Sequence, residues 1–219
     1  MIVHHPPEDL LLALAAGRLM AGQDLVVAAH AERCAECASR MQTFAALGGA
    51  MLEHSAPHPM AADALSKTLQ QITALPRGIR ASAPAEAPPA AWLPAGVAWP
   101  ACLSGREVTP WRRIGPGRRF ARVQLPQSYG ASLFLLSIEP GRTLPRHRHE
   151  QLELTQVLGG TFADDRGTFG PGDFDMAGAD VHHEPVVQPG SACACLTWVD
   201  GRLRFDSGIA AAIAHWVGV

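Results

Sequence analysis

The sequence predicts a two-domain α+β protein, with a small helical bundle in its N-terminal part and a domain of short β-strands in its C-terminal part. Three observations support this fold class. Apolar residues recur at helical spacing up to about residue 75, a Pro/Ala-rich segment follows, and short apolar or alternating runs separated by turn residues make up the remainder. We therefore divide the 219 residues into a helical domain over 1–76, a linker over 77–104 and a β-domain over 105–219.

The helical domain opens with Pro6-Pro7 followed by Glu8-Asp9. This is a typical helix start, because proline fits the first turn and acidic groups interact favourably with the helix dipole. Apolar stripes within 10–15, 25–47 and 65–72 predict three or four helices, and we expect Gly48-Gly49 to interrupt them. A bundle of this size buries little apolar surface, so it needs an additional source of stability such as a bound metal.

The linker over 77–104 is rich in proline and alanine, as in Ala83–Ala90. Such a segment cannot assemble a core and tends to be extended, which is typical of a connection between domains. Trp92 and Trp99 are large apolar side chains, so we expect parts of the linker to dock on a neighbouring domain.

The β-domain consists of short runs bounded by turn residues such as Pro140-Gly141 and Asp200-Gly201. Many short strands with regular turns are typical of a β-sandwich or barrel. The predicted strands are Arg119–Leu125, Ser132–Ile138, Glu153–Phe162, Ala192–Val199 and Arg202–Phe205. We expect the apolar segment Ile209–Val219 to cap this domain.

The charge balance does not favour a nucleic-acid-binding protein. Lys and Arg number 18 against 20 Asp and Glu, and the arginines are dispersed apart from Arg112-Arg113 and Arg118-Arg119. The start of the chain lacks the pattern of a secretory signal, and no apolar run reaches the roughly 20 residues that a membrane span needs. We therefore expect a cytoplasmic protein that contacts neither nucleic acid nor membrane, with five cysteines that serve as thiols or metal ligands rather than structural disulfides.

The helical domain contains the motif His30-x3-Cys34-x2-Cys37. On a helix these side chains share one face, because they lie about one turn apart. Thiolates and imidazoles are the ligands that zinc prefers in closed tetrahedral sites. The motif therefore predicts a zinc site, and a fourth ligand from His5, or alternatively His4, would join the start of the chain to this face.

Two other interpretations of this motif need no metal. Cys34 and Cys37 could be small buried apolar residues, with His30 at the surface. The Cys-x-x-Cys pair could also be a thioredoxin-type redox site, but the strand that precedes such a site is missing from this region. The histidine four residues before Cys34 and the spare His4-His5 pair favour the zinc site.

The β-domain contains His147, His149 and Glu153, which are separated by even numbers of residues. On an extended chain their side chains point the same way, so two imidazoles and a carboxylate would converge inside a barrel. Such a set is typical of a metal site with room for further ligands. We expect a fourth ligand from a later strand, from His182 or His183.

Cys193 and Cys195 also lie two residues apart, so both thiols face the same side of a predicted strand. Buried packing and a redox role are both compatible with this spacing. Cys102 has no partner nearby in the sequence, and we assign it no function.

The segment 141–160 reads Gly-x5-His-x-His-x3-Glu-x6-Gly and resembles the first motif of the cupin family. This resemblance implies a β-barrel that holds a metal ion. The second cupin motif, Pro-x-Gly-x-x-His, is matched in spacing by Gly178 to His183, with Gly178 and Asp180 in place of its Pro and Gly. The spacing selects His183 rather than His182 as the further ligand.

The chain as a whole resembles the ChrR-type zinc-dependent anti-sigma factors. The resemblance rests on His4-His5, the His-x3-Cys-x2-Cys motif, the cupin motif and the pair Cys193 and Cys195. It implies a helical zinc-binding domain that sequesters an ECF-type, sigma-E-like sigma factor, and a cupin barrel that releases it on sensing oxidative stress such as singlet oxygen or organic hydroperoxide. It also implies two zinc ions, one in each domain. Their ligands would be His5, His30, Cys34 and Cys37 in the helical domain and His147, His149, Glu153 and His183 in the barrel.

Two functional alternatives stay open at this point. A cupin metalloenzyme of dioxygenase or isomerase type, with a helical accessory domain, would use the open coordination positions of the barrel metal. A thiol–disulfide anti-sigma switch would instead centre on Cys34 and Cys37, whose oxidation would expel the zinc of the helical domain. Turnover of a small molecule separates the enzyme from both regulators.

Overall fold

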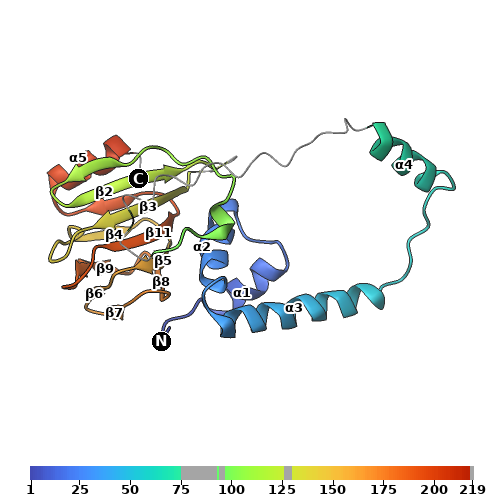
Figure 1. Ribbon diagram of the computed structural model, residues 1–219, viewed down its shortest axis with the longest axis horizontal. Helices are drawn as coiled ribbons and strands as arrows, with labels where there is room; N and C mark the ends of the chain where they lie inside the picture. The colour runs from blue at the N-terminus through green and yellow to red at the C-terminus, as the bar shows by residue number, and fades with distance from the viewer. Residues whose placement is uncertain (75–92, 94–96, 126–129, 218–219) are drawn as a thin grey trace.

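The computed structural model describes residues 1–74, 93, 97–125 and 130–217 of the chain. It has the expected two-domain α+β organisation, with a helical domain beside a cupin-like barrel (Figure 1). Most of the predicted linker, including Trp92, lies outside the described residues. Within the described ranges, no helix is both long enough and apolar enough to cross a membrane.

Helices occupy both ends of the described chain, and strands lie between them. The helices are α1 (Glu8–Ala15), α2 (Ala21–Ala31), α3 (Ala35–Glu53), α4 (Ala64–Ala74) and α5 (Gly208–Val217), with a short 3₁₀ helix η2 (Ala101–Leu103). The strands are β1 (Arg112–Gly115), β2 (Arg118–Val123), β3 (Ser132–Ile138), β4 (His147–His149), β5 (Glu153–Gly159), β6 (Phe162–Asp164), β7 (Gly167–Phe169), β8 (Phe174–Ala177), β9 (His182–His183), β10 (Val186–Val187), β11 (Cys193–Val199) and β12 (Leu203–Phe205).

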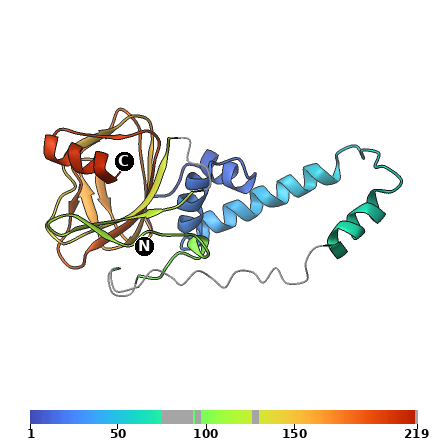
Figure 2. The same cartoon turned by 90° about the horizontal axis from the view of Figure 1, so that it is seen from above.

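The strands form three antiparallel sheets that enclose the barrel interior (Figure 2). The largest has the order β1-β2-β3-β11-β5-β8, and the smaller two have the orders β10-β6-β7 and β12-β4-β9. β11 comes late in the chain but lies between β3 and β5, so all of its residues are buried. α5 packs beside β12, and its Ile209 and Ala210 line the interior cavity, in the manner expected of a capping segment.

The predicted strand Glu153–Phe162 is two strands in the structure. β5 ends at Gly159, the chain turns, and β6 begins at Phe162. Gly160 has a φ of +70°, and a Cβ at this position would overlap the backbone of Cys193. The turn therefore requires glycine, because other residues rarely adopt this conformation and none would fit the space.

The predicted interruption at Gly48-Gly49 is wrong, because α3 continues through both glycines to Glu53. Each glycine costs about 1 kcal/mol relative to alanine in a helix. The neighbouring Ala, Leu and Met residues are strong helix formers, and their summed propensity carries the helix onward. The helix ends shortly before Pro57 and Pro59, which cannot continue it.

α2 joins the two domains into one hydrophobic core. On β11, Cys195 faces the barrel interior, whereas the alternate residues Leu196 and Trp198 share a core cluster with residues of α2. Gly22 of α2 permits this close approach, because a Cβ there would overlap the indole of Trp198. Trp99 packs against the same cluster, as we expected for part of the linker.

The second half of α3 and the whole of α4 project away from the barrel (Figures 1 and 2). α1 behaves differently, because its Leu11 is fully buried and its Leu10 and Leu14 pack against the shared core. The apolar stripe of α1 thus serves the protein's own interior, whereas α4 has no buried residue at all.

Candidate metal centres

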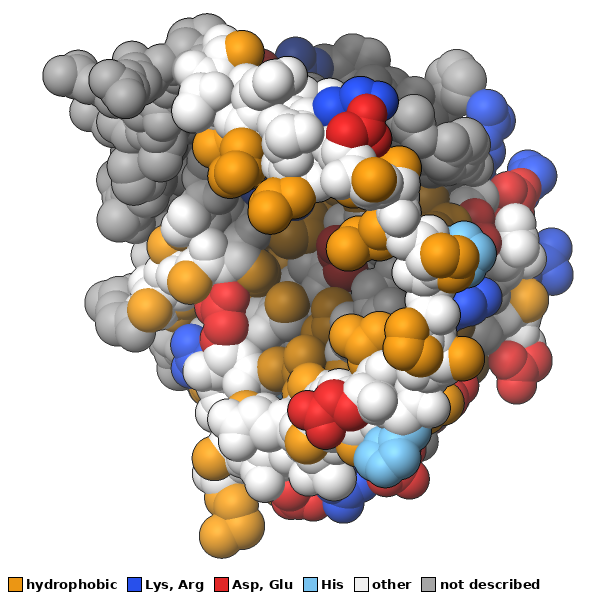
Figure 3. Space-filling view, turned by 90° about the vertical axis from the view of Figure 1, so that its right-hand side faces the viewer, with side chains coloured by type: hydrophobic (Ala, Val, Ile, Leu, Met, Phe, Trp, Pro, Cys, Tyr) orange, Lys and Arg blue, Asp and Glu red, His pale blue; other side chains and the backbone are white. Residues whose placement is uncertain are grey.

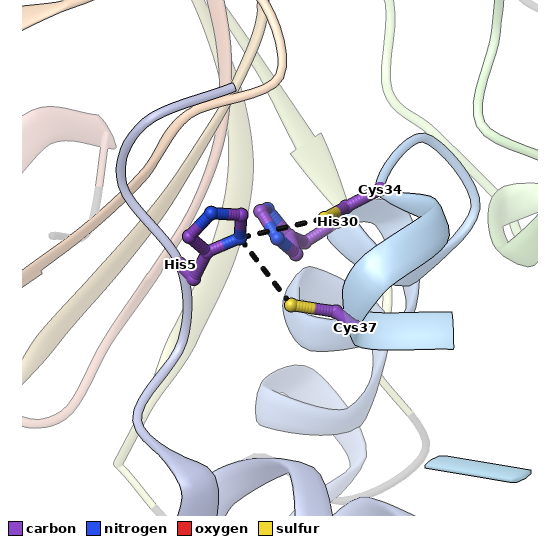
Figure 4. A group of neighbouring side chains, drawn as sticks. All are labelled: His5, His30, Cys34 and Cys37. Carbon is purple, nitrogen blue, oxygen red and sulfur yellow. Dashed lines mark hydrogen bonds between the residues drawn. The ribbon is translucent and has the colours of Figure 1, made fainter. Parts of the chain in front are cut away.

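The first candidate centre lies where the start of the chain meets α2 and α3 (Figure 4). It comprises His5, His30, Cys34 and Cys37, whose ligand atoms all lie within 4.8 Å of one another. Nδ1 of His5 is 3.4 Å from Sγ of Cys34 and 3.4 Å from Sγ of Cys37. In a tetrahedral zinc site with bonds of about 2.2 Å, neighbouring ligand atoms are about 3.6 Å apart. The spacing of this cluster therefore fits a zinc ion.

The hydrogen bonds of His30 leave one nitrogen for a metal. Nδ1 lies 3.0 Å from Oε1 of Gln156, and the Gln156 amide is oriented by its Nε2, which donates to the carbonyl of Val157. Because Oε1 can only accept, Nδ1 of His30 carries the proton and Nε2 keeps its lone pair. Nε2 is buried and has no hydrogen-bond partner among the described residues, which is the arrangement expected of a metal ligand.

His5, rather than His4, faces the cysteines. The ring of His4 lies beside that of Phe169, with the ring centroids 4.5 Å apart, and its Nδ1 lies 3.5 Å from the carboxylate of Asp173. Neighbouring side chains of an extended segment point in opposite directions, so only one of the two histidines can reach the cluster. The structure thus brings the four predicted residues of this site together, and their binding of a metal stays a prediction.

Burial controls the ionisation of the first cluster. It lowers the pKa of His30, so the imidazole is neutral near pH 7, as a metal ligand must be. It raises the pKa of the Cys37 thiol to about 12, and the hydrogen bond with Cys34 acts in the same direction. A bound zinc ion would supply the positive charge that thiolates need in this environment.

The second candidate centre lies inside the barrel and comprises His147, His149 and His183. The Nδ1 atom of each ring lies near an oxygen acceptor, namely the carbonyl of Pro145 for His147, the carbonyl of Gly178 for His149 and the carboxylate of Asp164 for His183. Because Nδ1 of His147 and Nδ1 of His183 donate to these oxygens, the Nε2 atoms of these two rings keep their lone pairs. Nε2 of His147 and Nε2 of His183 lie only 3.2 Å apart. Two lone pairs at this distance repel each other, and a shared cation would remove the repulsion.

Glu153 borders this cluster from the start of β5. The single extended segment expected for 147–153 is wrong, because the chain bends at 150–152 between β4 and β5. Glu153 nevertheless faces the interior, with Oε2 3.3 Å from Nε2 of His149. Burial alone would raise the pKa of Glu153, but the hydrogen bond and charge of His149 bring it down to about 2.

Of the two candidates for the fourth position, the structure places His183 in the cluster. Alternate residues of β9 face opposite sides, so His182 points outward. His182 is exposed, and its Nε2 lies 3.0 Å from the carboxylate of Asp206. Whether His183 binds a metal stays a prediction.

A charged network behind His183 escaped the sequence analysis. Arg166 contacts the carboxylates of Asp164 and Asp175, each at 2.7 Å, and Asp164 holds Nδ1 of His183. A carboxylate in this position orients a metal-binding imidazole and fixes its tautomer. No sequence spacing links these residues to His183, because they come together only when β6, β8 and β9 do.

A cavity of about 340 Å³ occupies the barrel interior, and His183 and Glu153 line it. Most of its wall is apolar, but Cys193 and Cys195 also line it. Both thiols are buried, and their Sγ atoms lie 3.7 Å apart. The hydrogen bond with Cys193, together with burial, raises the pKa of Cys195. The pair faces one side of its strand, as its spacing indicated, and a redox role for it stays a prediction.

Large apolar side chains are exposed where the helical domain projects from the barrel. We call this region the α3–α4 apolar surface. It comprises Leu47, Met51, Leu52, Met60, Leu65, Leu69 and Ile72. Figure 3 shows apolar side chains gathered around a hollow on this face of the molecule. Exposed apolar side chains that gather in one region are typical of a surface that binds another protein.

The fold and the two clusters define a class of protein in which a cupin-like barrel is joined to a helical domain with a His/Cys metal motif. The ChrR Cupin-like domain family matches residues 103–200. The Anti-sigma-E factor ChrR of Cereibacter sphaeroides is 40% identical over 209 residues, which cover 94% of this chain and 93% of that protein. The chain belongs to the ChrR family of anti-sigma factors, and the family resemblance seen in the sequence is confirmed.

The solved structure of a ChrR complex agrees with this assignment. The crystal structure of Rhodobacter sphaeroides SigE in complex with the anti-sigma ChrR contains a chain that is 34% identical, with a TM-score of 0.71, over 91% of this chain and 100% of that chain. An RmlC-like cupin protein from Ralstonia eutropha JMP134 aligns less closely, with 16% identity and a TM-score of 0.41 over 48% of this chain and 69% of that chain.

Proposed function

We propose that the protein is an anti-sigma factor that sequesters an ECF-type, sigma-E-like sigma factor through its helical domain. The observation that carries this proposal is the 40% identity to ChrR over 94% of the chain, which includes both domains. In the similar crystal structure, ChrR is in complex with SigE. Anti-sigma factors are regulators rather than enzymes, so this relationship disfavours the alternative of a cupin metalloenzyme.

The α3–α4 apolar surface is the proposed contact region for the sigma factor. On α4, Leu65, Leu69 and Ile72 are exposed at 71%, 52% and 59%. These residues recur at helical spacing, so they form one stripe of the kind that binds in an apolar groove of a partner. The stripe of α1 is unsuitable for this purpose, because the protein's own core occupies it.

Charge substitutions on α4 test this contact region. Leu65→Glu and Leu69→Glu should each weaken binding of the cognate sigma factor at least about tenfold, because a central apolar anchor contributes roughly 2 kcal/mol to such an interface. Gln70→Glu, which adds the same charge on the other side of α4, is the matched control. Calorimetric titration of the purified proteins gives the dissociation constants. Equal affinities for all three variants would exclude the α4 stripe as the contact.

The proposed role of the cupin barrel is to sense oxidative stress, such as singlet oxygen or organic hydroperoxide, in the cytoplasm. The three-histidine cluster supports a zinc ion in the barrel, in addition to the zinc proposed for the helical domain. A metal held there would offer open coordination positions to a small oxidant. The thiols Cys193 and Cys195 line the same cavity and are further candidate sensing groups.

Removal of the barrel ligands tests the division of labour between the domains. The double variant His147→Ala/His149→Ala should bind the sigma factor with unchanged affinity but no longer release it on treatment with hydroperoxide. A double variant Cys34→Ser/Cys37→Ser is the comparison, because the alternative thiol switch needs these two residues. If the histidine variant loses sigma binding itself, the barrel does more than sense. Turnover of a small molecule by the iron- or manganese-loaded protein would instead support an enzyme.

A further inference from the structure

The start of the chain is held by the barrel rather than by the helical domain. The backbone amides of Val3 and His4 donate to Oδ1 of Asp173 at 2.7 and 3.0 Å, respectively. The amide of Phe174 in turn donates to the carbonyl of His4 at 3.0 Å. The segment before α1 is therefore held at the start of β8, which is an edge strand of the six-stranded sheet. These hydrogen bonds place His5 at the first candidate metal centre.

A second residue of that centre is also held from the barrel. Along β5, Leu154 and Leu158 belong to the core shared with the helical domain, and Gln156 lies on the same face between them. Gln156 is fully buried, and its Oε1 accepts from Nδ1 of His30 across the domain interface. A buried amide among leucines costs free energy unless its hydrogen bonds are made, so this contact fixes both groups.

We propose that Gln156 and Asp173 are positioning residues for the first metal centre, so that the cupin barrel determines how firmly the helical domain retains its metal. This inference rests on the proposal that the first centre binds a metal. Gln156 sets the tautomer and orientation of His30, and Asp173 fixes the segment that carries His5. Two of the four ligands thus depend on the barrel, whereas the two cysteines belong to the helical domain.

Gln156 lies on β5 and Asp173 directly precedes β8, and both of these strands also serve the second centre. Gln156 follows Glu153 by three residues on β5, and its side chain leaves the opposite face of the strand. Asp173 precedes Asp175 by two residues, and Asp175 belongs to the charged network behind His183. A movement of β5 at the second centre therefore displaces Gln156, which orients His30 in the first centre. A movement of β8 likewise displaces Asp173, which holds the segment of His5. In this way a change inside the barrel is transmitted to the metal site of the helical domain.

Cobalt(II) in place of zinc provides a readout that is specific for the first centre. Cobalt bound by thiolates has a thiolate-to-metal charge-transfer absorption that a site with only histidine and carboxylate ligands lacks. The full-length protein is loaded with cobalt, and the rate at which excess EDTA abolishes this absorption is measured. Cys34→Ser assigns the absorption, because it should vanish when a thiolate of the first centre is removed. Absence of the absorption from the unsubstituted protein would mean that the first centre itself is wrong.

Matched substitutions then test the positioning residues. Gln156→Leu removes the acceptor for His30, whereas Gln156→Glu retains an acceptor oxygen. Asp173→Ala and Asp173→Asn form the equivalent pair at the edge of the sheet. Ser137→Ala, which alters a buried polar residue elsewhere in the same sheet, is the control.

We expect Gln156→Leu and Asp173→Ala to lose cobalt from the first centre 10–100-fold faster, because removal of such outer partners typically weakens metal affinity by about this factor. The rate of cobalt release should stay within about threefold of the unsubstituted rate for Gln156→Glu and Asp173→Asn, because each keeps part of its contact. The same is expected for Ser137→Ala, which alters neither contact. Near-UV circular dichroism confirms that each variant is folded, and the Asp173 pair decides the question if Gln156→Leu does not fold. Unchanged release from folded Asp173→Ala, or equal acceleration by Gln156→Leu and Gln156→Glu, would overturn the proposal for the residue concerned.

Discussion

At the scale of single residues, hydrogen bonds to Nδ1 determine what the histidine clusters can do. The Nδ1 atoms of His30, His147 and His183 each face an oxygen that can only accept a hydrogen bond in this arrangement. Their Nε2 atoms are therefore left as electron-pair donors on the inner side of each cluster. Two such atoms in the barrel lie 3.2 Å apart, and a cation is the simplest partner for both.

Asp173 provides a residue-scale prediction about pH. Burial would raise its pKa, but the backbone amides of His4, Val3 and Gly170 donate to its carboxylate and lower the pKa overall. A group with a lowered folded-state pKa stabilises the protein above its unfolded pKa of about 3.9, and this contribution disappears as the pH falls through the folded value. The difference in free energy of unfolding between the unsubstituted protein and Asp173→Ala should therefore shrink below about pH 4.

Denaturant titrations of the metal-free proteins between pH 6 and pH 2 measure this difference without a contribution from metal loss. Asp173→Asn serves as the control, because it keeps one acceptor oxygen but cannot ionise. If the difference in free energy of unfolding between the unsubstituted protein and Asp173→Ala stays constant down to pH 2, the charge of the Asp173 carboxylate does not contribute to holding the start of the chain.

Sequence patterns located the candidate ligands but not the residues that hold them. His30, Cys34 and Cys37 could be found because the geometry of a helix relates them within eight residues. Gln156 could not, because its partner His30 lies 126 positions away. The one available signal was a polar residue between Leu154 and Leu158 on the same face of its strand, and its partner cannot be identified until the tertiary structure is known.

At the scale of elements, the contact of α2 with β11 decides how the two domains combine. Every residue of β11 is buried, because one face lines the barrel and the other lies against the helical domain. The sequence showed this strand as an almost fully apolar run, which is typical of burial on both sides. It could not show that a helix from the first domain supplies one of these sides.

Substitution of Gly22 tests this contact. Gly22→Val should destabilise the protein by about 1–3 kcal/mol, because the added side chain would overlap the indole of Trp198 and force α2 away from the sheet. Gly48→Ala is the control, since no atom lies within 4 Å of a Cβ at that position and alanine favours the helix. Thermal unfolding measures the loss of stability, and the near-UV circular dichroism of the tryptophans reports the displacement of α2 from Trp198. A fully stable Gly22→Val protein would contradict the proposed packing of α2 on the barrel.

The barrel illustrates how turns limit prediction at this scale. Alternating or fully apolar runs bounded by turn residues identified the long strands, including Ser132–Ile138, which has the same bounds in the structure. The shorter strands that complete the barrel, such as β4 and β9, contain too few residues to show any period. His147 and Glu153 therefore reach one interior from two different strands, although the sequence suggested a single extended segment.

At the scale of the whole molecule, the described chain consists of a closed region, in which apolar side chains are buried in a core, and an open region, in which apolar side chains are exposed. The barrel, α1 and α2 share a continuous core that borders the first candidate metal centre, and the second centre lies inside the barrel. The second half of α3 and α4 instead expose apolar side chains away from it (Figure 3). The anti-sigma function proposed here assigns the open region to the sigma factor and the closed region to the control of its release.

The most direct test of this function is transcription in vitro with RNA polymerase core enzyme, the cognate ECF-type sigma factor and a promoter that it recognises. Addition of the full-length, zinc-loaded protein in equimolar amount to the sigma factor should form a complex detectable by size-exclusion chromatography and abolish the sigma-dependent transcript. The Leu65→Glu protein should require a clear excess to do the same. A folded, zinc-loaded protein that forms no complex and leaves the amount of transcript unchanged would contradict the central claim that this protein sequesters a sigma factor.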